Sequence, residues 1–96
     1  MSERREQYLV ASQQALIDVV ETLAEGPLSH SSVAEIIEAT GHPRDAVFRA
    51  LQNLAYRGWA ESPPGGGWRL APGLVAIAER LRLAIAELHR RYFPGD

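Results

Sequence analysis

Residues 43–59, Pro-Arg-Asp-Ala-Val-Phe-Arg-Ala-Leu-Gln-Asn-Leu-Ala-Tyr-Arg-Gly-Trp, predict a short amphipathic helix that decides the fold. At about 100° per residue, its apolar side chains form one stripe, made of Val47, Ala50, Leu51 and Leu54. Polar and aromatic side chains lie opposite the stripe or beside it: Asp45, Arg49, Gln52, Tyr56 and Phe48. Pro43 suits the first turn, and Gly58 stands where a left-handed cap is common. The helix thus has one face for a core and another that is free to contact a partner.

Two further helices are expected before this one. Residues 4–24 carry apolar side chains at helical spacing, and Gly26-Pro27 ends the pattern. Ser32 and Glu35 have the spacing of a capping box at the start of a second helix. Residues 40–42, Thr-Gly-His, make the turn that follows, since glycine readily takes positive φ. The order is helix, tight turn, helix.

A small hairpin is expected after the central helix. Residues 59–62 and 68–70 form two short strands around a Pro-Pro-Gly-Gly-Gly loop. Trp59, Trp68 and Leu70 would face the core, and Arg69 would face outward. The loop tip carries no charge, whereas loops that grip phosphates usually carry Arg or Lys. Helix, turn, helix and hairpin is the order of a winged helix-turn-helix, whose second helix enters the DNA major groove.

The last expected element is a helix over residues 73–92, about 30 Å long. Its apolar side chains fall three and four apart, like an a/d seam of nearly three heptads: Leu74, Ile77, Leu81, Ile85, Leu88 and Tyr92. Glu79 with Arg82 and Glu87 with Arg91 can pair on the outer face. The seam could pack on the first helix of the same chain. We favour a homodimer, because so long a helix exceeds the core available.

Composition limits the other possibilities. The 96 residues, 46% of them hydrophobic, fit one mostly α-helical domain with a small β-hairpin: a winged helix-turn-helix over 1–72 and a C-terminal helix over 73–93. There is no cysteine. A signal-type apolar run and a stretch of ~18 apolar residues are both missing, so we expect a cytoplasmic protein without a membrane partner.

Charge is divided unevenly along the chain. The net charge is −2, whereas nucleic-acid modules are usually basic. Residues 1–41 hold two arginines and seven acids, a balance of −5; residues 42–96 hold eight arginines and five acids, a balance of +3. The half that contains the central helix is therefore the basic one.

The chain resembles the N-terminal DNA-binding domain of IclR-type regulators over about residues 14–80. The likeness rests on these segments: Glu25-Gly26-Pro27-Leu28, Thr40-Gly41-His42-Pro43, Val47-Phe48-Arg49 with Leu51 and Leu54, Arg57-Gly58, and Gly67-Trp68-Arg69-Leu70 with Pro72, Leu74 and Ala76. The resemblance implies a DNA-binding transcriptional regulator whose recognition helix, residues 43–57, lies in the major groove.

By the family pattern, Arg44, Phe48 and Arg49 would hold DNA-facing positions. Ala46 stands where threonine is usual, and Asp45 where a small residue is common. With Asp45, Gln52 and Arg69, these residues make up the expected contact set for double-stranded DNA. Family members continue into a ligand-binding domain, so this chain corresponds to the DNA-binding half, and we expect no effector pocket.

Signs of catalysis or metal binding are missing from the sequence. His30, His42 and His89 are scattered and look like surface or turn histidines, and no cysteine can complete a zinc site. The Gly65-Gly66-Gly67 run joins two strands and does not open a helix, unlike a phosphate-binding loop. We therefore expect no enzyme activity and no cofactor. The alternative is a winged helix that binds protein, because exposed aromatic and arginine side chains are typical of protein interfaces.

Overall fold

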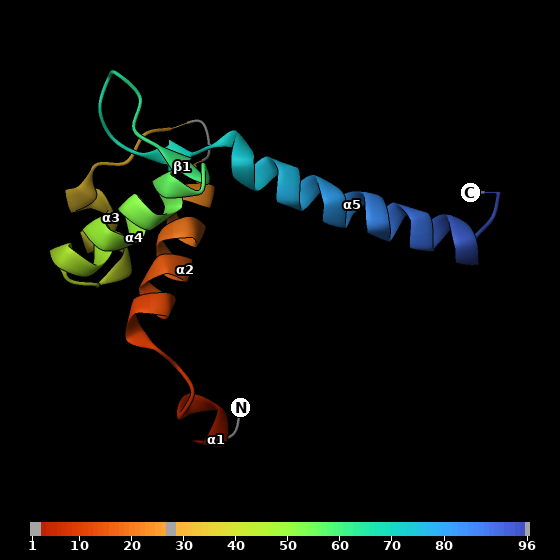
Figure 1. Ribbon diagram of the computed structural model, residues 1–96, viewed down its shortest axis with the longest axis horizontal. Coiled ribbons are helices and arrows are strands. Elements are labelled where there is room, and N and C mark those ends of the chain that lie inside the picture. The colour runs from red at the N-terminus through yellow and green to blue at the C-terminus, as the bar shows by residue number, and fades with distance from the viewer. Residues whose placement is uncertain (1–2, 27–28, 96) are drawn as a thin grey trace.

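The computed structural model describes residues 3–26 and 29–95, and its elements form a helical body with one long projecting helix (Figure 1). In chain order the elements are α1 (Glu3–Glu6), α2 (Ala11–Ala24), α3 (Val33–Thr40), α4 (Arg44–Tyr56), β1 (Ala60–Glu61), β2 (Arg69–Leu70) and α5 (Pro72–Tyr92). This is the winged helix-turn-helix with a C-terminal helix that the sequence predicts. Pro27 and Leu28 lie outside the described residues.

The core lies where α2, α3 and α4 meet. Four of its side chains are completely or almost completely buried: Val19 from α2, Ile36 from α3, and Val47 and Leu51 from α4. The predicted stripe of α4 is confirmed, because Ala50 and Leu54 are buried with them. Burying one such aliphatic side chain typically contributes ~1.5–3 kcal/mol. Packing of this three-helix core therefore fixes how α4 sits in the domain.

Local signals set the ends of α3 as predicted. Ser32 Oγ accepts the Glu35 N–H at 3.1 Å, and the Ser32 N–H donates to Glu35 Oε1 at 2.8 Å. The second bond favours the charged carboxylate and lowers the pKa of Glu35 below its ordinary value of 4.5. Gly41 closes the helix at φ 75°, a conformation that glycine takes without steric cost.

The first predicted helix is broken in two. Instead of one helix over residues 4–24, α1 ends at Glu6 and α2 begins at Ala11, with Val10 extended at φ −111°. The side chains of Tyr8 and Leu9 are 74% and 54% exposed, so this segment packs on no core. A helix that continued through these residues would gain too little free energy from its backbone hydrogen bonds alone, without tertiary packing, to persist. Leu9 is therefore not part of the buried face, which Ala15, Val19 and Leu23 supply.

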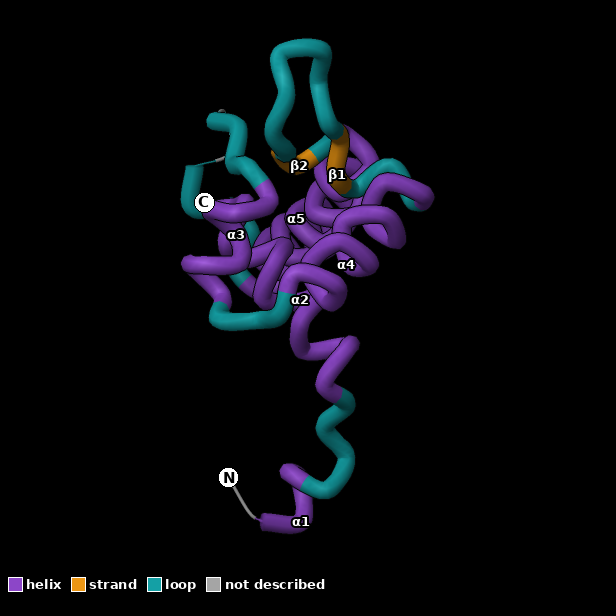
Figure 2. The backbone as a smooth tube through the Cα atoms, turned by 90° about the vertical axis from the view of Figure 1, so that its left-hand side faces the viewer, coloured by secondary structure: helices purple, strands orange, loops and turns teal. Residues whose placement is uncertain are grey.

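The hairpin is shorter than predicted and has an additional backbone partner. β1 and β2 pair antiparallel, Ala60 with Leu70 and Glu61 with Arg69. Trp68, expected in the second strand, instead exchanges two backbone hydrogen bonds with Ser31, at 2.8 and 2.9 Å. Trp59, Trp68 and Leu70 pack partly buried against the core, as expected. The loop stands above the helices in Figure 2.

The helix α5 projects away from this body and extends the molecule to 50 Å (Figure 1). Its main packing on another element is against β1. Among the described residues it has no comparable packing against α2, so the packing of the seam on the first helix that we considered is not observed. Backbone bonds anchor its start: the Gly73 N–H donates to Gly58 O at 2.9 Å and the Ala71 N–H to Trp59 O at 2.8 Å. Within the described ranges, none of the helices is both long and apolar enough to cross a lipid bilayer.

Ion pairs on α5 agree only in part with the prediction. Arg82 pairs with Glu79, as expected, and its guanidinium lowers the pKa of that carboxyl. Glu87 accepts a bond from Arg90 and not from Arg91. Both pairs have i,i+3 spacing. Neighbours three and four apart are equally within reach on a helix, so sequence spacing alone does not select the partner.

Candidate nucleic-acid interface

The turn before α4 is held by its own side chains and by α2. Thr40 Oγ1 donates to Ile36 O at 2.8 Å and accepts the His42 N–H at 3.3 Å. His42 Nε2 lies 2.7 Å from Asp18 Oδ2 on α2. Pro43 caps α4 with φ −62° and ψ 153°, one position before the first turn in which we predicted it. These contacts fix the direction in which α4 leaves the turn.

The outward face of α4 carries five of the six predicted DNA contacts. They are Arg44, Asp45, Phe48, Arg49 and Gln52, all of them exposed. The exposed fraction of the Arg49 side chain is 77%, so its guanidinium is open to a ligand. Arg44, Asp45 and Phe48 line one shallow hollow near the start of the helix. Such an arginine, amide and carboxylate set can bond to base edges, and a guanidinium can also bond to phosphate.

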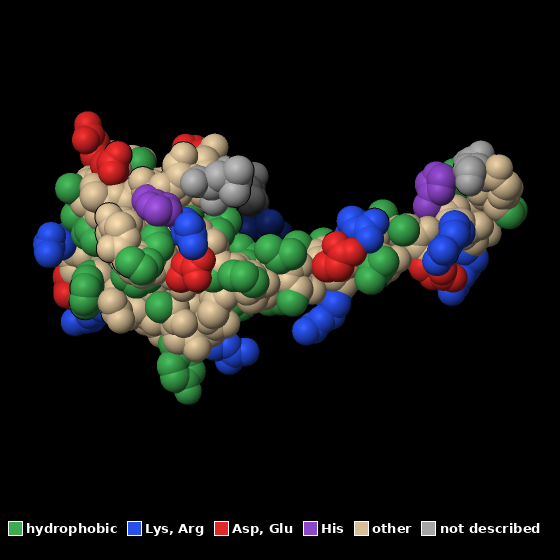
Figure 3. Space-filling view, turned by 90° about the horizontal axis from the view of Figure 1, so that it is seen from above, with side chains coloured by type: hydrophobic (Ala, Val, Ile, Leu, Met, Phe, Trp, Pro, Cys, Tyr) green, Lys and Arg blue, Asp and Glu red, His purple; other side chains and the backbone are tan. Residues whose placement is uncertain are grey.

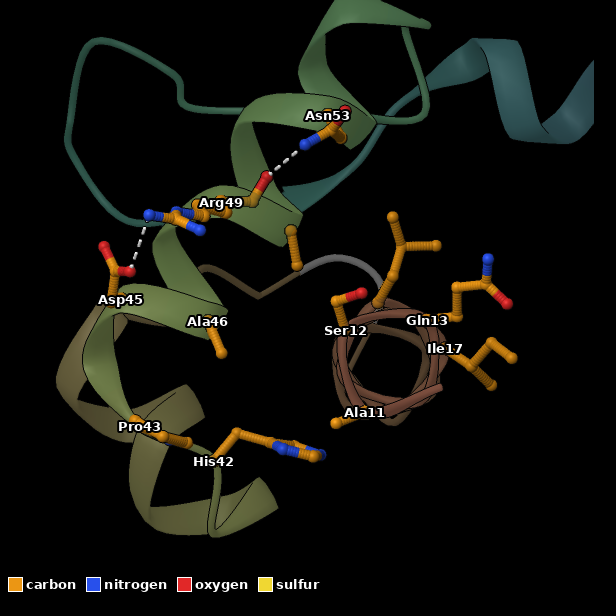
Figure 4. A pocket seen from close by; sticks show the side chains of 12 residues that line it. Ala11, Ser12, Gln13, Ile17, His42, Pro43, Asp45, Ala46, Arg49 and Asn53 are labelled. Carbon is orange, nitrogen blue, oxygen red and sulfur yellow. Dashed lines mark hydrogen bonds and ion pairs between the residues drawn. The ribbon is translucent and has the colours of Figure 1, made fainter. Parts of the chain in front are cut away.

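The charge on this face is partly compensated within the helix. Arg49 Nη2 lies 3.2 Å from Asp45 Oδ2, one turn earlier. Asn53 donates from Nδ2 to Arg49 O at 2.8 Å, so its side chain is bonded back to the helix (Figure 4). Asp45 also lies in the first turn of α4, where the helix dipole favours a negative charge. A ligand that binds Arg49 would therefore compete with Asp45 for it.

Arg69 differs from the other predicted contacts. Its Nε donates to Glu61 Oε1 at 2.9 Å, and its Nη1 lies 3.1 Å from His30 Nε2. It lines a cavity with the first turns of α5, and no α4 residue lines that cavity. Arg69 is thus engaged at the base of the hairpin and not beside the α4 face. Its neighbour in register, Glu61, was the sequence signal, since opposed charges on paired strands attract.

A cavity of about 860 Å³ lies between α2 and α4, and no pattern in the sequence predicted it. Figure 4 shows Ala46 directed toward α2, while Arg49 turns away from the cavity toward Asp45. Small side chains at Ala46 and Ala50 leave this space open. Ile17 of α2 is 45% exposed, and Figure 4 shows its side chain directed away from α4.

The three histidines are surface or turn residues, as we interpreted them, and each also has a side-chain partner. His42 bonds to Asp18, His30 to Arg69, and the His89 ring lies 5.0 Å from the Phe93 ring, measured between centroids. No group of three or more His, Asp or Glu side chains within residues 3–26 and 29–95 could hold a metal ion. Their contacts join elements together, and none of them builds a reactive site.

Comparison with known proteins identifies the same region. The model of the IclR helix-turn-helix domain matches residues 16–64, from α2 through β1. The crystal structure of HmgR from Pseudomonas aeruginosa is similar over 80% of this chain, with 30% sequence identity and a TM-score of 0.57. The chain spans 29% of the length of HmgR. No curated protein sequence matches the chain.

The matched residues contain most of α2, all of α3, the turn held by Thr40 and Gly41, and the whole of α4 with its exposed face. The family model covers half of the chain, and the solved structure extends the likeness to most of it. The chain belongs to the IclR helix-turn-helix domain family.

Proposed function

We propose that this protein is a DNA-binding transcriptional regulator without enzyme activity, which inserts α4 into the major groove as a homodimer. The observation that supports it most strongly is the division of α4 into two faces. Val47, Ala50, Leu51 and Leu54 are buried, while the polar side chains on the other face are exposed. A helix whose direction is fixed by its core can present those side chains to base edges in a defined register.

Arg49 and Arg44 have different roles in this proposal. Arg49 projects near the middle of α4, opposite the buried stripe, and a guanidinium there can bond to O6 and N7 of guanine together. Arg44 is the first residue of α4, where a phosphate contact is more accessible than a base. Asp45, Phe48 and Gln52 would complete the base-facing set, and Arg69 would contribute only after release from Glu61.

A second function is supported by the same face. Phe48 and Tyr56 are 47% and 88% exposed, and Arg49 already has a carboxylate partner in Asp45. Exposed aromatic and arginine side chains are the usual anchors of protein interfaces. The net charge of −2 and the uncharged hairpin tip also suit a protein partner better than DNA. A winged-helix domain that docks on another protein is therefore the alternative.

The experiment begins with selection of bound duplexes from a random DNA library, followed by titration of the selected duplex at several salt concentrations. Arg49→Ala should relax base preference at one position of each half-site, at a cost of ~1–3 kcal/mol in discrimination. Arg44→Ala should weaken binding to all sequences alike and lower the salt slope by about one. Both side chains are exposed, so neither variant should change the melting temperature appreciably.

Arg90→Ala is the matched control, because it removes the same charge from the far end of α5, where the side chain is exposed. It should leave both base preference and salt slope unchanged. DNA binding is contradicted if the wild type shows no salt-dependent affinity, or if Arg44→Ala and Arg49→Ala both bind like Arg90→Ala. A protein ligand on the Phe48 and Tyr56 face would then be the surviving explanation.

The homodimer predicts the arrangement of the selected sites. Two domains related by a two-fold axis should select inverted repeats, with half-sites spaced by about one turn of DNA, ~10 bp, or a multiple. Selection of single half-sites or direct repeats would contradict a two-fold dimer while leaving DNA binding itself intact.

A further inference from the structure

The helix α5 contains no buried residue, although much of its surface is apolar. Large hydrophobic side chains along it are 41–69% exposed: Val75, Ile77, Leu81, Leu83, Ile85, Leu88 and Tyr92. Hydrophobic side chains continue from the body onto the first turns of α5 in Figure 3. An exposed apolar surface of this extent typically marks an interface.

Five of these positions and the half-buried Leu74 form the predicted seam, which also repeats at intervals of eleven residues. The pairs are 74 and 85, 77 and 88, and 81 and 92. An eleven-residue interval matches the α-helix closely, so all six lie within an arc of about 80° and the stripe runs nearly straight along α5. Leu81 and Ile85 lie at its middle, and Leu74 and Tyr92 lie at its two ends. A straight stripe suits pairing with another straight helix.

One flank of the stripe has a hollow at its beginning. Leu74, Val75 and Ala78 of α5, with Leu70 and Arg69 of the hairpin, line a mostly apolar cavity of about 490 Å³. Val75 is 65% exposed, so the cavity is open to a ligand from outside. A cavity of this size can take aromatic side chains, which bury ~150–250 Å² each.

The same flank carries an aromatic ring at the other end of α5. Phe93, the residue that caps α5, is 58% exposed, and its ring lies 5.0 Å from that of His89, measured between centroids. At about 100° per residue, His89 lies on the flank that also holds Val75 and Ala78. Tyr92, 69% exposed, stands beside it at the end of the stripe. A hollow and an aromatic pair thus occupy opposite ends of one flank.

We infer that two copies of this chain pair through α5 in antiparallel orientation, and that Tyr92 and Phe93 of each copy fill the hollow beside Leu74 and Val75 of the other. This inference deepens the homodimer of the proposed function and rests on it. In an antiparallel two-fold pair, equal flanks of the two helices meet in reverse order. Leu81 then lies beside Ile85 of the second copy, and each aromatic pair lies beside a hollow, once at each end.

A parallel pair fits these residues less well. In a parallel pair, opposite flanks of the two helices meet at the same level along the helix axis. Arg80 of one copy then lies against Arg82 of the other, and Arg91 lies against His89. The antiparallel pair instead brings Arg80 beside Glu87 of the second copy. Arg80 has no hydrogen bond or ion pair within the described part of the chain, so it is available for this contact. Arg82, which meets its own counterpart near the middle, is already paired with Glu79.

α5 has 21 residues and is about 30 Å long, and each domain is attached at its first turn. Antiparallel pairing therefore places the two domains at opposite ends of the helix pair.

Disulfide cross-linking distinguishes the two orientations, because the chain has no cysteine of its own. Leu74→Cys and Tyr92→Cys are made separately in the whole chain, allowed to exchange subunits, and oxidised mildly. The antiparallel pair predicts a covalent dimer in the mixture of the two variants and almost none in either variant alone. Efficient linkage of each variant to itself, or no linkage in any combination, overturns the inference.

Sedimentation equilibrium tests the hollow. Leu81→Glu should give a folded monomer, because that side chain is 63% exposed and supports no core of its own. Phe93→Ala and Val75→Glu should each weaken dimerisation by at least tenfold. Leu83→Glu is the matched control: it lies opposite the stripe and is 54% exposed, so the dimer should persist. Full dimerisation of Phe93→Ala, or loss of the dimer in Leu83→Glu, contradicts the proposed contact.

Failure of this inference is separable from failure of the proposed function. The wild type could be monomeric at tens of micromolar and still bind DNA in the way that depends on Arg44 and Arg49. That result would contradict the α5 dimer and leave the DNA-binding proposal standing. The protein could instead form the predicted cross-links and show no salt-dependent DNA binding. That result would contradict the DNA-binding proposal and leave the α5 dimer standing.

Discussion

The helices α4 and α5 are both amphipathic, yet their apolar stripes have different outcomes. α4 buries its whole stripe against α2 and α3, and Leu51 is 0% exposed. α5 carries a longer stripe, of which no residue is fully buried. The difference lies in what surrounds each helix, since α4 is enclosed by neighbours along its full length while α5 leaves the body after its first turns. An apolar stripe therefore indicates a partner, but it does not tell whether that partner belongs to the same chain.

The largest expected difference comes from truncating one leucine in each stripe. Leu51→Ala should lower the free energy of unfolding by ~2–5 kcal/mol, because it opens a cavity in the core. Leu81→Ala should change it by less than ~0.5 kcal/mol in the monomer, since the side chain is 63% exposed. Denaturant titration at low micromolar protein compares the two variants. Similar losses for both would show that α5 supports the monomer fold.

The junction between the two regions should be the next most sensitive position. A Cβ atom on Gly73 would lie 2.4 Å from Gly58 O, a backbone atom that cannot move aside alone. Gly73→Ala should therefore destabilise the fold by ~1–3 kcal/mol. Gly65→Ala is the control, because a Cβ there meets nothing within 4 Å. Thermal unfolding of both variants tests the contact, and equal melting temperatures would refute it.

Loss of the capping box of α3 should have a smaller effect within the packed region. Ser32→Ala removes the acceptor for the Glu35 N–H and should cost ~1 kcal/mol. Ser12→Ala in the first turn of α2 is the comparison, since no side chain caps that helix. Denaturant titration measures both. If the two substitutions cost the same, the bond geometry at Ser32 adds nothing to stability.

The same capping box predicts a pH dependence. The pKa of Glu35 is lowered in the folded state by the Ser32 N–H, so the folded state binds its proton less readily than the unfolded chain. The contribution is therefore present above the ordinary pKa of 4.5 and is lost as pH falls through the lower folded value. Glu35→Gln should flatten this part of the stability curve. An unchanged pH profile for Glu35→Gln would contradict the prediction.

The smallest expected effect concerns the bond between the turn and α2. Asp18→Asn removes the charge that lies 2.7 Å from His42 Nε2 and should cost ~0.5 kcal/mol, because the two side chains remain 45% and 23% exposed. Glu21→Gln, an exposed acid on the same helix, is the charge-matched control. Chemical denaturation at neutral pH measures the free energy of unfolding of both variants. Asp18→Asn should be less stable than Glu21→Gln only if the bond to His42 stabilises the fold. A loss above ~2 kcal/mol would mean that the turn depends on this pair more than its exposure suggests.

The sequence predicted those parts of the fold that local rules determine. The stripe of α4, the Ser32–Glu35 capping box and the positive φ of Gly41 and Gly58 all follow from neighbours within one or two turns. Element order and the IclR resemblance are confirmed for the same reason, since they depend on motifs that are contiguous in sequence. Such signals are read directly from spacing.

Contacts between distant residues were not predictable in the same way. His42 and Asp18 are separated by 24 positions, and nothing in their local sequence indicates that they meet. Arg69 was expected only to face outward. Its place opposite Glu61 could have indicated that pair, but nothing local indicates its contact with His30, 39 positions away. The break between α1 and α2 also escaped prediction, because helical periodicity continues through residues that have no core to pack against.

The bond between Gly73 and Gly58 joins the first turn of α5 to the glycine two residues beyond the end of α4. α5 therefore joins the body beside the end of α4, and this junction sets the direction in which the helix projects. A rotation of about 10° at this point would swing the far end of a ~30 Å helix by about 5 Å. The stiffness of the chain at these two glycines therefore limits how far the end of α5 can move relative to α4.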